Sequence, residues 1–214
     1  TKCQKKNEDD FNKVLSYKYT IWNSSTEKLG YSGVAVWSKL PFTDLGKIQG
    51  LEDNNQGRYL FLEFDKFYLI NAYVPNTGGD KDEYRQNIWN PAITNLLQEL
   101  KKKDKEIIYC GDLNVVHTEN DIYNPDIIKK AKSPGVKKYE RKNLDDMLEL
   151  GYTDTLRYIK PNDKLWTWWD PRTKGREKDN GWRLDYFLIS DKNMIKDSII
   201  ENTIYGSDHC PILL

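Results

Sequence analysis

The sequence has no net charge with which to attract a polyanion, because 33 lysine and arginine residues balance 33 aspartate and glutamate residues. Any affinity for nucleic acid must therefore come from local patches. The chain also has no apolar run near the ~18–20 residues of a membrane span and no signal peptide at its start. We therefore expect an intracellular protein with no membrane partner. Cysteine is scarce, and the three present are an odd number, which predicts reduced, buried thiols and not a disulfide framework.

Aromatic residues, in contrast, are plentiful. The 214 residues include seven Trp, fourteen Tyr and six Phe, enough to build a sizeable core. No repeat, low-complexity segment or domain boundary is found, which predicts one domain over residues 1–214. Apolar patterning predicts strands at 17–22, 31–37, 58–64, 67–74, 165–169, 182–190, 199–205 and 209–214, helices at 1–13, 81–103 and 138–149, and loops at 76–80 and 115–137. Strands 58–64 and 67–74 are expected to form a hairpin, and Pro91 to kink its helix. A two-sheet α/β sandwich covered by helices fits this order.

One predicted strand ends where polar groups gather. Apolar and aromatic residues follow Glu106 and stop at Gly111-Asp112-Leu113-Asn114. Residues i and i+2 of a strand face the same side, so Asp112 and Asn114 are expected to point to one place. There they could orient a water or hold a hard divalent cation. The alternative is an Asx turn that caps the strand.

Two further stretches place acids and a histidine beside apolar strands. Asp208-His209 stands just ahead of the apolar C-terminal residues, and Asp185 lies inside an otherwise apolar strand. A buried carboxylate without a partner destabilises its strand, and histidine is a natural partner. The chain has only two histidines, His209 and His117. The alternative for Asp208-His209 is a surface turn with a satisfied histidine. Together with the acid and amide above, these residues predict a metal-assisted hydrolytic site.

Tryptophans and basic residues alternate between positions 166 and 183. They are Trp166, Trp168, Trp169, Arg172, Lys174, Arg176, Lys178, Trp182 and Arg183. Aromatic rings interleaved with positive charge suit a surface that meets sugars, bases and phosphates. The alternative is that the tryptophans are core and the lysines are a solvated loop, and we expect it to hold for at least one or two of them.

Four motifs carry a resemblance that runs through nearly the whole chain. They are Asn71-Ala72-Tyr73-Val74-Pro75-Asn76, Cys110-Gly111-Asp112-Leu113-Asn114-Val115-Val116-His117, Gly181-Trp182-Arg183-Leu184-Asp185-Tyr186-Phe187 and Gly206-Ser207-Asp208-His209-Cys210-Pro211. In their order and spacing they resemble the exonuclease III family of apurinic/apyrimidinic (AP) endonucleases. The resemblance implies a four-layer α/β/β/α sandwich of the endonuclease/exonuclease/phosphatase type and dependence on Mg²⁺, with Mn²⁺ as an alternative. It also implies incision of double-stranded DNA on the 5′ side of an abasic site during base-excision repair, with 3′-phosphodiesterase or exonuclease activity as a second property. We expect a monomer.

The resemblance also assigns roles to the matched residues. The expected catalytic residues are Tyr73, Asp112, Asn114, Asp185 and His209. Among them, Asp112 activates the attacking water, Asn114 holds it, and His209, oriented by Asp185, contacts the scissile phosphate. The expected metal ligands are Asp208, Asp112 and Asn114. The expected substrate-binding residues are Asn76, Trp168, Arg172, Trp182 and Leu184, with the two tryptophans and the leucine as walls of a pocket for the baseless sugar.

The sequence departs from the family pattern in two places. Animal members carry an arginine after the residue matched by Asn76 that wedges into DNA, whereas Thr77-Gly78-Gly79 stands here and Arg172 is the candidate substitute. A metal-binding Glu in Leu-Gln-Glu, and a strand before it, would precede Thr1-Lys2. We therefore expect N-terminal strands to be missing and the domain to be truncated at both ends.

Two other functions remain open from the sequence. One is a phosphatase or phospholipase of the wider superfamily, which shares Gly-Asp-x-Asn and Ser-Asp-His, although Tyr-Val-Pro-Asn and Trp-Arg-Leu-Asp-Tyr argue against it. The other is a DNA-binding relative without metal chemistry. A nuclear location is expected, with the mitochondrion or plastid as alternatives.

Overall fold

A mixed six-stranded sheet lies at the centre of the computed structural model, which describes residues 2–78 and 81–214. In sheet order its strands are β3 (Thr43–Asp44), β4 (Tyr59–Glu63), β5 (Phe67–Tyr73), β6 (Glu106–Asp112), β10 (Asp185–Ile189) and β7 (Thr153–Asp154). β5 and β6 run parallel, and the other neighbours in this sheet are antiparallel. The predicted β4–β5 hairpin is confirmed. Gly79 and Asp80 of the predicted loop lie outside the described residues.

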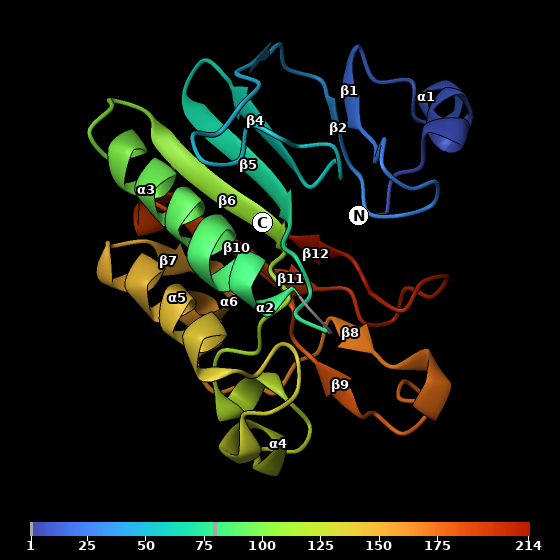
Figure 1. The fold of residues 1–214 in the computed structure, drawn as a ribbon, viewed down its shortest axis with the longest axis vertical. Helices are drawn as coiled ribbons and strands as arrows, with labels where there is room; N and C mark the ends of the chain where they lie inside the picture. The colour runs from blue at the N-terminus through green and yellow to red at the C-terminus, as the bar shows by residue number, and fades with distance from the viewer. Residues whose placement is uncertain (1, 79–80) are drawn as a thin grey trace.

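Helices cover one face of this sheet (Figure 1). They are α2 (Asp82–Tyr84), the π-helical segment η2 (Arg85–Trp89), α3 (Asn90–Leu100) and α5 (Lys138–Glu149). Ile93 and Leu97 of α3 and Leu144 of α5 pack with Tyr109 of β6 in one core cluster, as their helical spacing predicts. The predicted helix 138–149 is confirmed. The expected kink at Pro91 is wrong in position. The irregular turn is the π-helical segment η2, which ends two residues before the proline. Pro91 has no backbone N–H to donate to a carbonyl of that turn.

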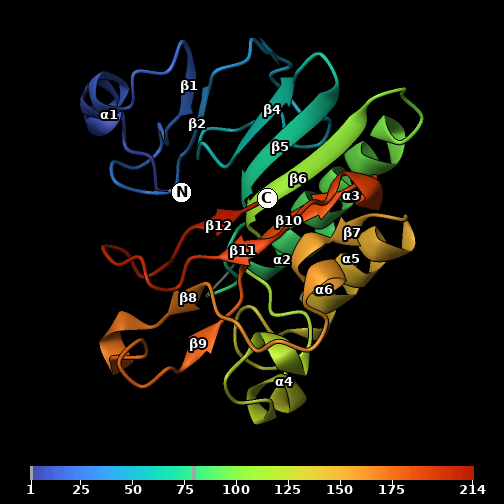
Figure 2. The same cartoon turned by 180° about the vertical axis from the view of Figure 1, so that it is seen from behind.

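A smaller sheet covers the other face. β1 (Tyr19–Asn23) and β2 (Val34–Ser38) pair antiparallel, and Val34 packs with Leu60 and Leu62 of β4 in a second apolar cluster. α1 (Glu8–Leu15) lies on the far side of this small sheet from the central one (Figures 1 and 2). The order helices, sheet, sheet, helix confirms the predicted four-layer α/β/β/α sandwich.

Two short hairpins and several single turns complete the described architecture. The hairpins are β8 (Trp168–Trp169) with β9 (Gly181–Trp182), and β11 (Ile199–Ile200) with β12 (Ile212–Leu213). The turns are η1 (Lys5–Asn7), η3 (Glu119–Asp121), α4 (Asp126–Lys130), α6 (Thr155–Ile159), η4 (Pro171–Thr173) and η5 (Lys192–Met194). Within residues 2–78 and 81–214, no helix has the length and apolar character needed to cross a bilayer.

Several predicted boundaries are wrong. The strand predicted at 182–190 is divided into β9 and β10, because the backbone N–H of Arg183 donates to Asp121 O and that of Leu184 to Thr167 Oγ1. The strands predicted at 199–205 and 209–214 shrink to two residues each. The helix expected at 1–13 is α1, preceded by η1, and β7, α4 and α6 were not predicted. All three cysteines are free, Cys210 buried and the other two half-buried.

Candidate active site

Three side chains singled out from the sequence stand in one row across the central sheet. Tyr73, the last residue of β5, is opposite Asp112, the last residue of β6, and Asp112 is opposite Asp185, the first residue of β10. Parallel β5 and β6 end at the same edge, where antiparallel β10 begins, and opposed residues point to the same face. The sheet therefore brings a phenol and two carboxyl groups together. A cavity of about 590 Å³, lined in part by Asp112, Asp185 and His209, opens beside them.

Asp112 and Asn114 meet, but not through a shared strand face. β6 ends at Asp112, and Asn114 has a left-handed backbone, with φ of 48°. Its backbone N–H donates to Asp112 Oδ1 at 2.9 Å, and its Nδ2 lies 3.3 Å from Asp112 Oδ2 and 2.9 Å from Val74 O. The expected strand geometry is therefore wrong, and the alternative, an Asx turn, is what joins the two side chains. Asn76 joins the same turn, with its Nδ2 3.3 Å from Asn114 Oδ1.

His209 is the partner of Asp185. Its Nδ1 lies 2.7 Å from Asp185 Oδ2, and its Nε2 lies 3.9 Å from Asp112 Oδ2. Burial lowers the imidazole pKa, but the charge and hydrogen bond of Asp185, followed by the charge of Asp112, outweigh burial and raise the pKa of His209 to about 9. His209 therefore carries a proton at neutral pH. The other histidine, His117, pairs instead with Asp145, at 2.8 Å.

Asp112 is only 2% exposed. Burial and the carboxylate of Asp185 raise its pKa to about 7, against the opposing charge of His209. A group that titrates near neutral pH is well matched to accepting a proton from a water. Burial, and secondly the charge of Asp112, raise the pKa of the Tyr73 phenol to about 12, so this phenol stays protonated and can donate a hydrogen bond.

Asp208 brings a third carboxylate to the imidazole. Its Oδ2 accepts a hydrogen bond from Trp168 Nε1 at 3.2 Å and lies 3.9 Å from Lys2 Nζ. Burial works against ionisation, but the charges of Lys2 and His209 outweigh it and lower the pKa of Asp208. This carboxylate is therefore ionised at neutral pH and, with a side chain 30% exposed, partly open to solvent.

The donor atoms present suit a hard divalent cation. Three carboxyl groups, those of Asp112, Asp185 and Asp208, surround the single imidazole of His209, so oxygen is the main donor atom offered here. Mg²⁺ takes oxygen ligands and is held by one or two carboxylates, with water and phosphate completing its shell. In the described part of the chain, no group of three or more His, Cys, Asp or Glu side chains is arranged to hold a metal. An ion bound through Asp208, Asp112 and the Asn114 amide would thus depend on water and substrate for its other ligands.

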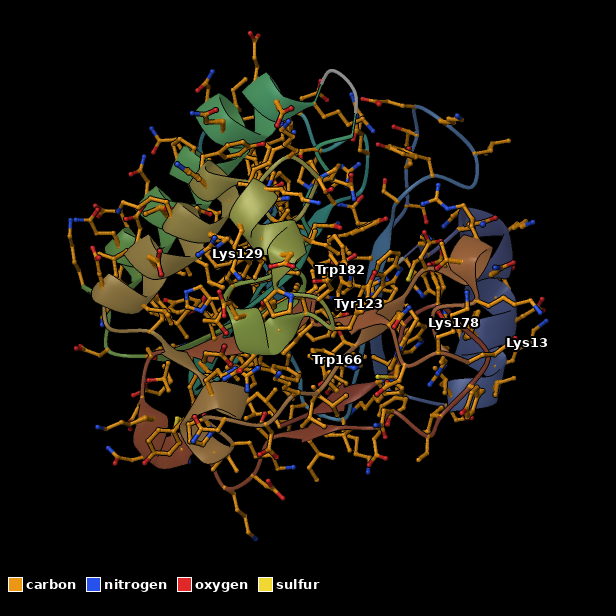
Figure 3. The ribbon with its side chains drawn as sticks, turned by 90° about the horizontal axis from the view of Figure 1, so that it is seen from below. Lys13, Tyr123, Lys129, Trp166, Lys178 and Trp182 are labelled. Atoms are coloured by element: carbon orange, nitrogen blue, oxygen red, sulfur yellow. The ribbon has the colours of Figure 1, made fainter. Side chains whose placement is uncertain are left out.

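Two tryptophans form a wall beside the row. Trp168 and Trp182 are opposite each other in the β8–β9 hairpin, with ring centroids 5.7 Å apart and planes at 78°. Trp168 also forms a β-bridge with His209, which brings the wall to the imidazole. Leu184 is buried in an apolar cluster against which both rings pack. Trp182 and Tyr123 lie close together in Figure 3, and the backbone N–H of Tyr123 donates to the O of Gly181, the neighbour of Trp182, at 3.0 Å.

The other aromatic and basic residues of this stretch divide into core and surface. Trp166 and Trp169 are buried, at 7% and 4% exposure, so the core interpretation holds for these two. Arg172 is at the surface, with a side chain 86% exposed that pairs with Asp170. Arg183 is 1% exposed and makes a bidentate pair with Asp154, at 2.9 and 2.7 Å, so it holds the fold and is not available to substrate.

Sequence reasoning missed one buried residue of the site, Arg85. Its Nη2 donates to Leu113 O at 2.9 Å, and its Nη1 donates to Asn114 O at 2.9 Å and to Pro75 O at 3.1 Å. Glu140 of α5 supplies the counter-charge at 3.1 Å. Arg85 therefore ties the loop after β5 to the turn after β6. Arg85 is the first residue of the π-helical segment η2, and no pattern in the sequence reveals that segment.

Comparison with known proteins identifies the family. Residues 4–209 match the model of the Endonuclease/Exonuclease/phosphatase family, and the chain belongs to this family. It is 37% identical over 202 residues to an exodeoxyribonuclease of Bacillus subtilis, covering 92% of this chain and 78% of that protein. It is 38% identical over 221 residues to the DNA repair nuclease APEX1 of Danio rerio, covering 100% and 70%.

The solved structure of an AP endonuclease from Archaeoglobus fulgidus is also similar, with a TM-score of 0.80 and 27% identity over 99% of this chain and 84% of that one. These similarities confirm the family and the fold expected from the four motifs.

Proposed function

We propose that the chain is a phosphodiester hydrolase that incises double-stranded DNA on the 5′ side of an abasic site. One observation carries this proposal. Asp112 Oδ2 lies 3.9 Å from Nε2 of His209, whose Nδ1 pairs with Asp185 at 2.7 Å, and the wall formed by Trp168 and Trp182 stands beside this group. The names of the relatives, an exodeoxyribonuclease, a DNA repair nuclease and an AP endonuclease, support it.

In this proposal each side chain of the site has a separate role in hydrolysis. Asp112 takes a proton from the attacking water, which the amide of Asn114 holds. The new phosphorus–oxygen bond forms to that water as the bond to the 3′ oxygen of the upstream sugar breaks. The 3′ oxygen takes a proton from solvent water as it leaves, and Asp112 later returns its proton to solvent. His209 faces the phosphate and stabilises its developing charge, while Asp185 keeps the imidazole oriented and charged. The Tyr73 phenol donates a further hydrogen bond to phosphate.

A divalent cation is part of the proposed site. Asp208, Asp112 and Asn114 are the residues that would hold it. Bound Mg²⁺ supplies additional electrostatic stabilisation of negative charge on the phosphate. Mn²⁺ is the alternative, because carboxylate and carbonyl oxygens suit both ions.

The substrate side of the site is assigned to residues around the tryptophan wall. Trp168, Trp182 and Leu184 are proposed to enclose the baseless sugar, which costs less to extrude than an intact nucleotide because it has no base to unstack. The Asn76 amide, held against Asn114, is proposed to bind phosphate. Arg172 has a largely exposed side chain in the neighbouring loop and is proposed to contact the DNA backbone.

A panel of substrates tests the proposal. The protein is incubated with Mg²⁺ and a duplex containing one abasic residue, the same duplex intact, a duplex with a blocked 3′ end, and a phosphoinositide. We expect incision of the abasic duplex, with or without removal of the blocked 3′ end. The name of the Bacillus subtilis relative, an exodeoxyribonuclease, favours this second activity. Hydrolysis of the phosphoinositide alone would favour the phosphatase or phospholipase alternative. Binding of abasic duplex without cleavage would favour the non-catalytic relative.

Three expectations from the sequence stay predictions. They are a single domain over residues 1–214, a monomer, and a nuclear location. The similarity to a bacterial protein gives the nuclear location no support.

A further inference from the structure

The segment that delivers Asp208 and His209 to the site lies at the surface. It joins β11 to β12, which pair through only two residues each. Residues 202–207 are all exposed, and Tyr205 is 75% exposed. Such a segment has little buried apolar area to fix it, so other contacts must hold its shape.

One side chain from a different loop supplies these contacts. Arg176, half-buried, reaches from the loop between β8 and β9. Its Nη2 donates to Asn202 O at 2.8 Å and to Ile204 O at 2.6 Å, and its Nη1 donates to Ser207 O at 3.3 Å. A single guanidinium thus holds three backbone carbonyls spread over six residues. The planar, rigid fork of arginine suits such a contact, whereas a lysine ammonium is a compact point charge without that fork.

Two aromatic rings fix the plane of this guanidinium. Its central carbon lies 4.6 Å from the ring centroid of Trp169 and 4.1 Å from that of Tyr205. Trp169 is buried in the core and Tyr205 is exposed, so Arg176 connects the surface loop to the core. The contact is therefore an anchor to the core.

The same tryptophan holds the segment directly. The backbone N–H of Trp169 donates to Asp208 O at 3.0 Å, one residue beyond the Ser207 carbonyl that Arg176 binds. Trp168 next to it forms the bridge to His209. Loss of the Arg176 contacts would leave Asp208 and His209 attached to β8 on one side and to an unsupported loop on the other.

We propose that Arg176 is a positioning residue, which clamps the loop 202–207 so that Asp208 and His209 are held in register with Asp112 and Asp185. This inference rests on the proposed function, because it assumes that Asp208 and His209 act in hydrolysis. Arg176 itself touches no reacting group.

Arg176→Lys is the test variant, because it keeps the charge and removes the fork. Glu177→Gln is its matched control, since Glu177 is the next residue of the same loop and its side chain is 72% exposed. Two quantities are measured for each variant and the wild type, with a thermal melt to show that each is folded. The first is the amide exchange rate of Trp169, whose N–H reports on the bond to Asp208 O. The second is kcat and KM for incision of abasic duplex.

For Arg176→Lys we expect Trp169 exchange to rise at least about tenfold, because charge-assisted hydrogen bonds are lost. We expect kcat to fall about ten- to a hundredfold, as for a misplaced catalytic group, while KM stays within about twofold. Glu177→Gln should change neither Trp169 exchange nor kcat nor KM. Tyr205→Ala, which removes only the outer ring, should give smaller changes in the same direction.

Unchanged Trp169 exchange in Arg176→Lys would overturn the clamp, whatever the activity. Faster exchange with unchanged kcat would overturn the positioning role, and a rise in KM with kcat unchanged would identify a DNA contact instead. The exchange measurement needs no substrate. A wild-type protein that does not incise abasic duplex would therefore overturn the proposed function, and the role of Arg176 with it, without altering what exchange says about the clamp.

Discussion

Replacing Asp185 by Asn should move the whole pH–activity profile toward acid. The Asp185 carboxylate has two effects on the site, since it raises the pKa of His209 to about 9 and contributes to raising that of Asp112 to about 7. Asparagine keeps the shape of the side chain and removes its charge. Both pKa values should then fall, so the acid limb, set by deprotonation of Asp112, and the alkaline limb, set by deprotonation of His209, shift in the same direction.

The size of the effect at a given pH follows from the His209 protonation state. At pH 8 an imidazole with a pKa of about 9 is ~90% protonated, whereas one with the ordinary value of 6.5 is ~3% protonated. If only protonated His209 is active, Asp185→Asn loses about thirtyfold at pH 8 and much less at pH 6. The same shift affects stability. A raised folded-state pKa of His209 stabilises the fold fully below pH 6.5, and this contribution is lost as the pH rises through about 9.

Single-turnover incision of abasic duplex between pH 5 and 10 measures the two limbs. NMR titration of the imidazoles measures the pKa of His209 directly, and assignment is simple because the chain has only one other histidine, His117. A wild-type His209 with a pKa near 6.5, or an Asp185→Asn profile that is lowered equally at every pH, would refute the reasoning. The first would show that the Asp185 contact does not charge the ring, and the second that the charge is not used.

Three further predictions concern other parts of the site. Asp112→Asn should remove nearly all incision and leave abasic-DNA binding largely intact, because the carboxylate acts on a proton in the transition state; turnover retained within about tenfold of wild type, measured with binding in the same buffer, would contradict its role. Trp182→Ala should reduce discrimination between abasic and intact duplex while salt-dependent binding changes little, and unchanged selectivity with a lower Tm would show that the ring is only core. Arg85→Met should cost about 3–5 kcal/mol in a urea melt because Glu140 is left buried without its counter-charge, and Glu140→Gln in that background should recover part of the loss; no recovery would show that the pair is not the source.

The sequence was most informative where one residue was in an unfavourable place. Asp185 stands in an apolar strand, and the cost of burying a lone carboxylate was enough to predict a histidine partner, which is His209 at 2.7 Å. The contact between Asp112 and Asn114 was predicted from strand alternation, which is the wrong reason. The backbone of Asn114 is left-handed, and the alternation of residues along a strand does not predict such a conformation.

Other contacts between distant segments could not be predicted from the sequence. In the sequence Arg85 is one polar residue within the predicted helix 81–103, and its acceptors at 75, 113 and 114 become neighbours only when β5 and β6 align in parallel. The tryptophans of the 166–182 stretch could not be sorted either. Trp166 and Trp168 are two residues apart, so in one continuous strand they would face the same side. Trp166 is nevertheless buried and Trp168 half-buried, because only residues 168 and 169 are in strand geometry.

Hydrolysis of abasic duplex in ¹⁸O-labelled water tests the central claim most directly. In the proposed reaction the phosphorus–oxygen bond on the 5′ side of the abasic residue is broken by water that Asp112 activates. Mass spectrometry of the two fragments of the abasic strand should therefore show a 3′ hydroxyl on the upstream piece and one ¹⁸O in the 5′ phosphate of the downstream piece, and Asp112→Asn should form almost none of either. Cleavage on the 3′ side with an unsaturated sugar end, or products without label, would contradict the account.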